Sequence, residues 1–131
     1  MVNYNNMGKT RQYLRWASCG VVGLAVSPNC NIKFVDNKAC ASPACEDVYL
    51  WDFKRNETVC VLRADAKYVV STLAISRNRN WIAVGYADGT IRLFDPSAAA
   101  DGPRLVFSGH KSSVASLEFD SDQLRLISGG K

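Results

Sequence analysis

Short apolar runs, each bounded by polar or turn-forming residues, recur along this chain at a nearly constant spacing. The run 70–75 matches the run 114–119 at an offset of 44 residues, with apolar side chains at the same three positions. The same offset carries Ile82 onto Leu126. Self-similarity at a period of roughly 20–50 residues is typical of repeat architectures. The pattern therefore predicts a repeated structural unit.

Two further parts of the unit recur upstream. Residues 48–52 (Val-Tyr-Leu-Trp-Asp) match residues 91–95 (Ile-Arg-Leu-Phe-Asp) at an offset of 43, and residues 59–62 match 104–107 at an offset of 45. Each part is a short run rich in branched and aromatic residues, which favours a strand. None of them sustains the 3.6-residue period of an amphipathic helix. The unit is therefore predicted to be built from strands.

The clearest predicted hairpin joins residues 82–85 to residues 90–94 through Asp88-Gly89. Gly accepts a positive φ angle without steric cost and Asp tolerates one, so this pair suits a tight turn. Pro96 then ends the second strand, because proline has no amide hydrogen to give to a neighbouring strand. Four such strands form a small antiparallel sheet that cannot bury both faces alone. Radial stacking of several sheets solves this problem.

The radial arrangement is a β-propeller, and the chain carries the WD-repeat pattern. Trp51-Asp52, the variant Phe94-Asp95 and Gly109-His110 stand at the spacing that the repeat requires. We predict an all-β chain that forms an incomplete WD-repeat β-propeller of about two and a half four-stranded antiparallel blades. Because a propeller needs at least about four blades to close, the chain is predicted to be a fragment or truncated product.

The predicted boundaries follow from the repeat. An N-terminal extension over 1–20 precedes the partial propeller at 21–131, whose blades lie at about 31–64, 69–109 and 114–131. The strands of blade two are predicted at 69–76, 81–86, 90–95 and 104–108. Blade one has predicted outer strands at 48–52 and 58–63, an inner strand at 31–35 and a weaker strand at 38–42. Blade three has 114–119 and 124–128, and a strand at 21–27 is a candidate to complete the last blade.

Composition places the chain among ordinary soluble domains. Hydrophobic residues make up 47% and charged residues 21% of the 131 residues, and no run of about 18 apolar residues predicts a membrane span. The net charge of +4 comes partly from clusters such as Lys54-Arg55 and Arg77 with Arg79. We interpret these clusters as solvated surface. An RNA-phosphate footprint is the less favoured alternative, because it needs charge gathered on one face, which a sequence does not show.

Candidate catalytic and metal-binding residues have simpler explanations. The five cysteines are an odd number without a signal peptide, which indicates reduced thiols in the cytosol or nucleus. Cys40 and Cys45 are too far apart for a CxxC zinc motif, and His110 is the single histidine. The carboxylate pairs Glu46-Asp47 and Asp120 with Asp122 fall in predicted turns, where acidic residues serve turn geometry. We therefore predict no enzymatic activity, no metal, no cofactor and no small-molecule substrate.

A resemblance covers residues 7–131. It rests on Thr-Arg-Gln-Tyr-Leu-Arg at 10–15, Glu-Asp-Val-Tyr-Leu-Trp-Asp at 46–52, Ala-Val-Gly-Tyr-Ala-Asp-Gly at 83–89, Ser-Gly-His-Lys at 108–111 and Arg-Leu-Ile-Ser-Gly at 125–129. With these motifs the chain resembles the nucleolar WD-repeat subunits of the small-subunit processome, the family called DIP-two or UTP-twelve in yeast and WD-repeat protein three in animals. Family members begin at a Met-Gly like Met7-Gly8, so residues 1–6 are interpreted as an upstream extension.

The resemblance implies a function. The chain is expected to act as a non-catalytic scaffold of a nucleolar pre-ribosomal particle, supporting small-subunit rRNA processing and ribosome biogenesis. Implied partners are other WD-repeat processome proteins, with pre-rRNA and the small nucleolar ribonucleoprotein contacted indirectly, and no membrane; the implied location is the nucleus and nucleolus. Two alternatives stay open: a truncated fragment without function, and a general WD-repeat adaptor such as a ubiquitin-ligase receptor. The adaptor is less favoured because Trp51-Asp52 and Phe94-Asp95 both lack the Trp-Asp-x-Arg pattern.

The family also implies structural roles for several residues. Its Gly-His histidine, here His110 after Gly109, bonds the turn aspartate of its own blade, and Ser128 stands at a further position of that network. The partner aspartate of His110 would follow Lys131, so we expect His110 to be unpaired. Blade two has Asp88 in the turn but Asp65-Ala66 in place of Gly-His, which implies an incomplete network. Asp52 and Asp95 are expected to occupy structural WD-repeat positions. From the residues themselves, Trp51 and Phe94 are predicted to pack on their sheets, and RNA stacking by either is the less favoured alternative. Tyr86 follows a glycine near the end of the predicted hairpin, so it is predicted to be exposed to a partner.

Overall fold

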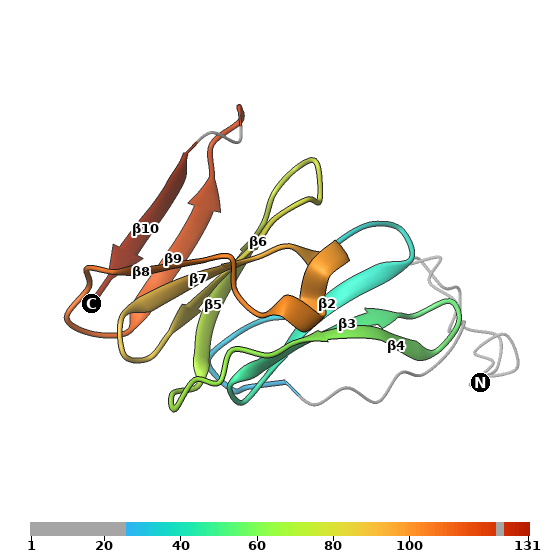
Figure 1. The fold of residues 1–131 in the computed structure, drawn as a ribbon, viewed down its shortest axis with the longest axis horizontal. Coiled ribbons are helices and arrows are strands. Elements are labelled where there is room, and N and C mark those ends of the chain that lie inside the picture. Colours follow the sequence, from blue (N-terminus) through green and yellow to red (C-terminus); the bar gives the residue numbers. More distant parts are fainter. Residues whose placement is uncertain (1–25, 123–124) are drawn as a thin grey trace, which may run out of the picture.

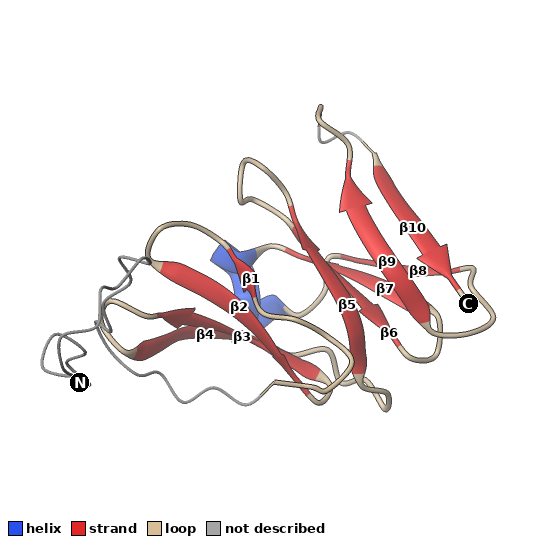
Figure 2. Cartoon of the chain, turned by 180° about the vertical axis from the view of Figure 1, so that it is seen from behind, coloured by secondary structure: helices blue, strands red, loops and turns tan. Residues whose placement is uncertain are grey.

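The computed structural model describes residues 26–122 and 125–131, and it contains three antiparallel sheets (Figure 1). The predicted extension at 1–20 and most of the predicted strand at 21–27 lie outside the described residues. The sheets stand side by side and do not close into a ring within this part of the chain (Figure 2). The all-β prediction of a partial propeller is confirmed.

Blade one is a four-stranded sheet in the order β1 (Lys33–Phe34), β2 (Ala39–Ala44), β3 (Asp47–Asp52), β4 (Glu57–Leu62). The inner strand predicted at 31–35 is reduced to two residues. A turn closed by the bond from Cys30 N to the Ser27 carbonyl precedes it, and a turn at Asp36 follows it. These turns leave only a short segment that can pair with β2. The strand β2 itself ends two residues later than the predicted strand at 38–42.

Blade two is complete, in the order β5 (Val70–Ile75), β6 (Ile82–Tyr86), β7 (Thr90–Phe94), β8 (Leu105–Ser108). Every strand lies within one residue of its predicted bounds. The connection from β7 to β8 holds a 3-10 helix, η2 (Pro96–Asp101), that was not predicted. Pro96 stops the strand as expected, and Asp95 then caps the helix by accepting a bond from the Ser97 amide.

Blade three consists of β9 (Val114–Phe119) and β10 (Leu126–Gly130), which pair antiparallel. Leu126 lies opposite Phe119, and Ser128 lies opposite Leu117. The prediction of two strands in this region is confirmed, with β10 shifted two residues toward the C-terminus relative to the predicted segment.

The core lies between the sheets, and β6 is buried along its whole length because it is covered on both faces. Alternate side chains of a strand point to opposite faces of its sheet. Ile82 and Val84 accordingly pack into the apolar cluster shared with blade one, and Ala83 packs into the cluster shared with blade three. This sandwiching explains why the β6 sequence is continuously apolar instead of alternating.

Candidate functional site

The antiparallel order gathers the connecting loops at two ends of the molecule. The loops β2–β3, β4–β5, β6–β7 and β8–β9 lie at one end, which we call the Asp88 end. The loops β1–β2, β3–β4, β5–β6 and β7–β8 lie at the other, which we call the Asp52 end. The sheets hold these loops in place, and loops on a rigid scaffold are the usual carriers of binding function.

The aspartates of the predicted WD positions all close turns. The carboxylate of Asp52 accepts bonds of 2.9 Å from the amides of Lys54 and Arg55. Asp95 accepts from the Ser97 amide at 2.9 Å and from its hydroxyl at 2.6 Å, and these bonds hold the pKa of Asp95 below its ordinary value. Such local bonds from Asp to backbone amides are the mechanism that favours Asp in turns.

Asp88 serves its own hairpin. It accepts bonds from the Thr90 amide at 3.0 Å and from the Thr90 hydroxyl at 2.7 Å. Blade two has Ala66 where the repeat has the histidine of Gly-His, so no imidazole is present to bond Asp88. The bonds to Thr90 hold its carboxylate instead. Gly89 follows at φ +88° and lies so close to the β8–β9 loop that an added Cβ would stand 2.3 Å from the His110 carbonyl oxygen. The β6–β7 turn of blade two therefore packs directly against the β8–β9 loop, which leads into blade three.

The expectation that His110 would be unpaired is wrong. Its Nε2 lies 2.8 Å from the Ser128 hydroxyl, which projects from β10. Gly130 leaves room for the imidazole, because a Cβ there would stand 2.6 Å from the His110 Nδ1. Gly109 meets no such crowding. The histidine therefore bonds within its own blade, because Ser128 supplies a hydroxyl at hydrogen-bond distance.

Trp51 and Phe94 occupy equivalent strand ends but differ in burial. Phe94 is fully buried in the cluster between blades one and two. Trp51 is half-buried and follows a register shift between Leu50 and Trp51 in the β3–β4 pairing. The indole Nε1 of Trp51 is buried without a hydrogen-bond acceptor among the described residues.

Tyr86 was expected to be exposed, and this prediction is wrong. Its relative exposure is 0%, and its hydroxyl donates to the Glu46 carbonyl oxygen at 3.3 Å, across the boundary from blade two to blade one. Burial raises the pKa of Tyr86 well above its usual range. Tyr86 ends β6 on the face that meets blade one, so it completes the interface between the blades.

Arg92 was missed by the sequence reasoning. Its guanidinium lies 5.2 Å from the centre of the Tyr86 ring and donates through Nη1 to the Ala64 carbonyl oxygen in the β4–β5 loop. Alternation along β7 could have predicted that Arg92 points toward blade one, because it lies two residues from the buried Phe94 and so on the same face of the strand. Arg92 thus holds the loop that would otherwise carry a Gly-His pair.

Asp47 lies beside the same loop, on blade one. The backbone amide of Ala64 faces its carboxyl and favours the charged form. Burial and the neighbouring Glu46 nevertheless raise the pKa of Asp47 above its ordinary value. Ala64 therefore lies between the two blades: its carbonyl oxygen accepts from Arg92 of blade two, and its amide faces Asp47 of blade one.

The thiols of the described residues are all free. Burial raises the pKa of Cys30, Cys40 and Cys60, which lowers the fraction of reactive thiolate at neutral pH. No group of three or more His, Cys, Asp or Glu among residues 26–122 and 125–131 could hold a metal ion. In the same part of the chain no helix is long and apolar enough to cross a membrane.

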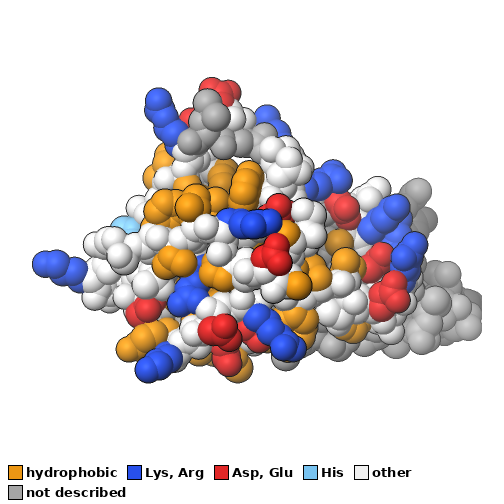
Figure 3. All heavy atoms as spheres, in the orientation of Figure 1, with side chains coloured by type: hydrophobic (Ala, Val, Ile, Leu, Met, Phe, Trp, Pro, Cys, Tyr) orange, Lys and Arg blue, Asp and Glu red, His pale blue; other side chains and the backbone are white. Residues whose placement is uncertain are grey.

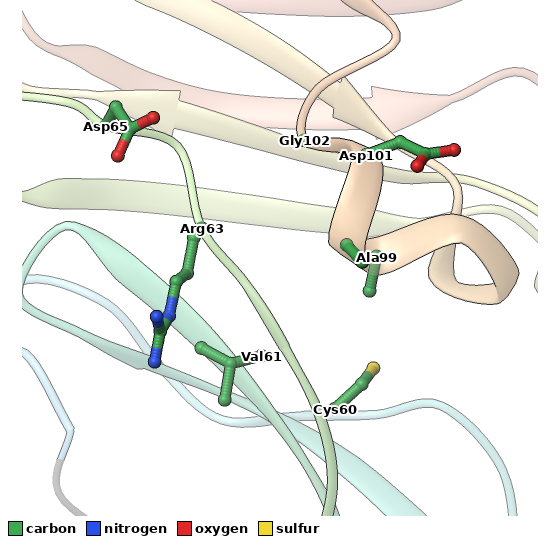
Figure 4. A pocket seen from close by; sticks show the side chains of 8 residues that line it. Cys60, Val61, Arg63, Asp65, Ala99, Asp101 and Gly102 are labelled. Atoms are coloured by element: carbon green, nitrogen blue, oxygen red, sulfur yellow. The ribbon is translucent and has the colours of Figure 1, made fainter.

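A cavity of about 600 Å³ opens at the rim between β4 and η2 (Figure 4). The residues that line it include Cys60, Val61, Arg63, Asp65, Ala99 and Asp101. The side chain of Cys60 points toward η2, where its Sγ lies 4.0 Å from the Pro96 carbonyl oxygen. The cavity separates the outer strand of blade one from the helix of blade two.

Comparison with known proteins agrees with this architecture. The family model described as "WD domain, G-beta repeat" matches residues 56–95 and 102–131. WD repeat-containing protein 3 of Mus musculus is 41% identical over 93 residues, which is 67% of this chain and 10% of that protein. U3 small nucleolar RNA-associated protein 12 of Saccharomyces cerevisiae is 35% identical over 97 residues, which is 66% of this chain and 10% of that protein. The chain thus spans about a tenth of the length of these relatives.

A solved structure of U3-55K superimposes with a TM-score of 0.69. The match covers 81% of this chain and 34% of that chain at 21% sequence identity. At this identity the likeness is one of fold, and it supports the arrangement of the sheets described above.

Proposed function

This chain belongs to the WD40-repeat family, and from that premise we propose that it is part of a non-catalytic scaffold of a nucleolar pre-ribosomal particle that supports small-subunit rRNA processing. The observation that carries the proposal is the similarity to WD repeat-containing protein 3, at 41% identity over 67% of this chain. The similarity to U3 small nucleolar RNA-associated protein 12, whose name ties it to a small nucleolar RNA, points to the same particle.

The geometry suits a scaffold. The blades present loops at two ends on sheets that are packed together through two apolar clusters, so the loops are already ordered before a partner binds. Pre-ordered loops reduce the entropy lost on association. We propose that these loops contact other WD-repeat proteins of the particle and that the protein works in the nucleolus.

The WD positions then have a supporting role. We propose that Asp52, Asp88 and Asp95 fix the turns, that Trp51 and Phe94 pack the strand ends, and that His110 after Gly109 joins Ser128 within blade three. Each keeps a loop in a fixed position and contacts no substrate. In blade two, Arg92 takes over the anchoring of the β4–β5 loop by bonding the Ala64 carbonyl oxygen.

The proposal is tested by tagging the protein at its own locus and recovering it from nuclear extract. U3 small nucleolar RNA and processome proteins are expected to be enriched over a tagged, unrelated WD40 protein. Depletion of the protein should make unprocessed small-subunit precursor rRNA accumulate while large-subunit precursors mature normally. Recovery of ubiquitin-ligase subunits in place of U3 RNA, with normal rRNA processing, would refute the proposal and favour an adaptor.

A further inference from the structure

An apolar cleft opens at the Asp88 end, between blades one and two. It has a volume of about 210 Å³, and its apolar lining comes from Val26, Pro28, Ala44, Cys45 and Val69. No charged side chain among the described residues lines it. We call these five residues the Val69 cleft.

The cleft is built by loops of two adjoining blades. Cys45 lies in the β2–β3 turn of blade one, and Val69 lies in the β4–β5 loop that leads into blade two. The Val70 amide donates to the Cys45 carbonyl oxygen at 2.8 Å, and the Ala87 amide donates to the Val69 carbonyl oxygen at 3.0 Å. Blades pack face to face, so a neighbouring blade covers a sheet face and leaves the loops at the end open. The exposure of the cleft is therefore a property of the loop end and not of an uncovered sheet face.

Large side chains are exposed beside the cleft on an ordered loop. Tyr68 is 52% exposed and Val69 is 45% exposed. Their loop is held by the Val69 carbonyl bond and by the bond from Arg92 to the Ala64 carbonyl oxygen. Figure 3 shows apolar and basic side chains together at the surface at its lower left, where Figure 1 places this loop. A tyrosine presented in this way is typical of the residues that dominate the binding energy of protein interfaces.

Size and polarity determine what the cleft can hold. Its volume of about 210 Å³ is below the about 300–1,000 Å³ of small-molecule sites, so it fits a single side chain. The Ser27 hydroxyl at the cleft already accepts a bond of 2.9 Å from the Cys45 amide. A phosphate would meet no cation among the lining residues. The cleft therefore suits one aliphatic side chain of another protein better than a phosphate or a nucleobase.

Opposite charges flank the cleft. Lys67 precedes Tyr68 on the blade-two side, and Glu46 follows Cys45 on the blade-one side; both charged side chains are exposed. Within the described residues neither of them forms an ion pair. A segment that crosses the cleft from one loop to the other passes one cation and one carboxylate. Charge complementarity therefore requires an acidic residue on one side of the inserted side chain and a basic residue on the other.

We propose that the Val69 cleft binds an extended segment of a partner protein, which inserts one branched aliphatic side chain. The acidic residue of the segment meets Lys67, and its basic residue meets Glu46. The inference deepens the proposed function, on which it rests, because it assigns one contact with another protein of the particle to the Asp88 end and states the chemistry of that contact.

The partner segment is identified by photocross-linking in the tagged protein. Benzoylphenylalanine in place of Tyr68 is expected to cross-link to one processome protein, at a segment that has a branched aliphatic residue between an acidic and a basic one. The same analogue in place of Val106, which is 56% exposed on β8, is the control and should not cross-link to that segment. Cross-links to RNA alone, to no processome protein, or to a segment without this chemistry would overturn the inference.

The affinity test titrates a labelled peptide of the cross-linked segment with the purified tagged protein. Val69→Asp is expected to weaken binding by about 10- to 150-fold, the range for losing the burial of one aliphatic side chain. Lys67→Glu should also weaken binding, and replacing the acidic residue of the peptide by lysine should restore part of the affinity. The controls Val106→Asp and Lys111→Glu change an exposed valine and an exposed lysine elsewhere and should bind as the unchanged protein does. Equal losses in the controls, or unchanged binding by Val69→Asp, would contradict the inference.

The outcome is separable from that of the proposed function. The side chains of Lys67 and Val69 are exposed, so circular dichroism should show both variants folded. If the unchanged protein recovers U3 RNA and processome proteins but the analogue at Tyr68 cross-links to none of these proteins, the scaffold proposal stands and this inference is wrong. If the unchanged protein recovers no processome component, the proposed function fails and the inference fails with it.

Discussion

Gly89 is the position where a single methyl group should disturb the boundary between blades two and three most directly. It lies in the β6–β7 turn at φ +88°, a conformation that L side chains rarely adopt. An alanine Cβ there would lie 2.3 Å from the His110 carbonyl oxygen and 2.8 Å from that of Ser112. Both contacts are with backbone atoms, so the loop must move to relieve them.

Two other glycines allow the effect of backbone strain to be measured apart from the effect of steric overlap. Gly102 has φ +76° but no atom within 4 Å of an added Cβ, so alanine there carries conformational strain alone, about 1–3 kcal/mol. Gly109 has neither a positive φ nor a close neighbour, so Gly109→Ala should be neutral or stabilise by about 0.4–1 kcal/mol. Gly89→Ala combines strain with overpacking and should exceed Gly102→Ala by about 1–3 kcal/mol.

The assay is urea unfolding of the three variants, followed by tryptophan fluorescence and circular dichroism. The free energy of unfolding should fall in the order Gly109→Ala, Gly102→Ala, Gly89→Ala. If Gly89→Ala is no less stable than Gly102→Ala, the β6–β7 turn does not press on the β8–β9 loop as described. A change in the denaturant slope would instead indicate that the variant no longer unfolds as one unit.

Three other changes have defined outcomes. Tyr86→Phe removes the hydroxyl that bonds the Glu46 carbonyl and should cost about 0.5–1.5 kcal/mol in urea unfolding; an unchanged midpoint would mean that the bond contributes nothing. Ser128→Ala should cost a similar about 0.5–1.5 kcal/mol through the lost bond to His110, and Ser128→Thr should recover part of it. Folding raises the pKa of Asp47 above its ordinary value of 3.8, so the folded state is destabilised when this carboxyl is charged. The destabilisation is full at a pH above the folded-state pKa, and it is lost as the pH falls through that pKa toward 3.8. Asp47→Asn should therefore be more stable than the unchanged chain at pH 7, with the difference vanishing toward pH 3.8 in a series of thermal scans.

The sequence by itself determined the repeat and the strands of blade two. Those strands lie within one residue of their predicted ends because their causes are local: alternation or burial within each run, Asp-Gly at the turn, and Pro96 after β7. The repeat also predicted the positions of Asp52 and Asp95, and the structure adds that each carboxylate bonds amides two or three residues away.

Only the tertiary structure decided how distant segments meet. Tyr86 bonds Glu46 from 40 residues away, and Arg92 reaches Ala64 across 28 residues, so neither burial follows from a local pattern. The pairing of His110 with Ser128 depended on the register of β9 against β10. The physical reason is common to all of them: strand patterns are set by neighbours along the chain, whereas interfaces and surfaces are set by packing between sheets.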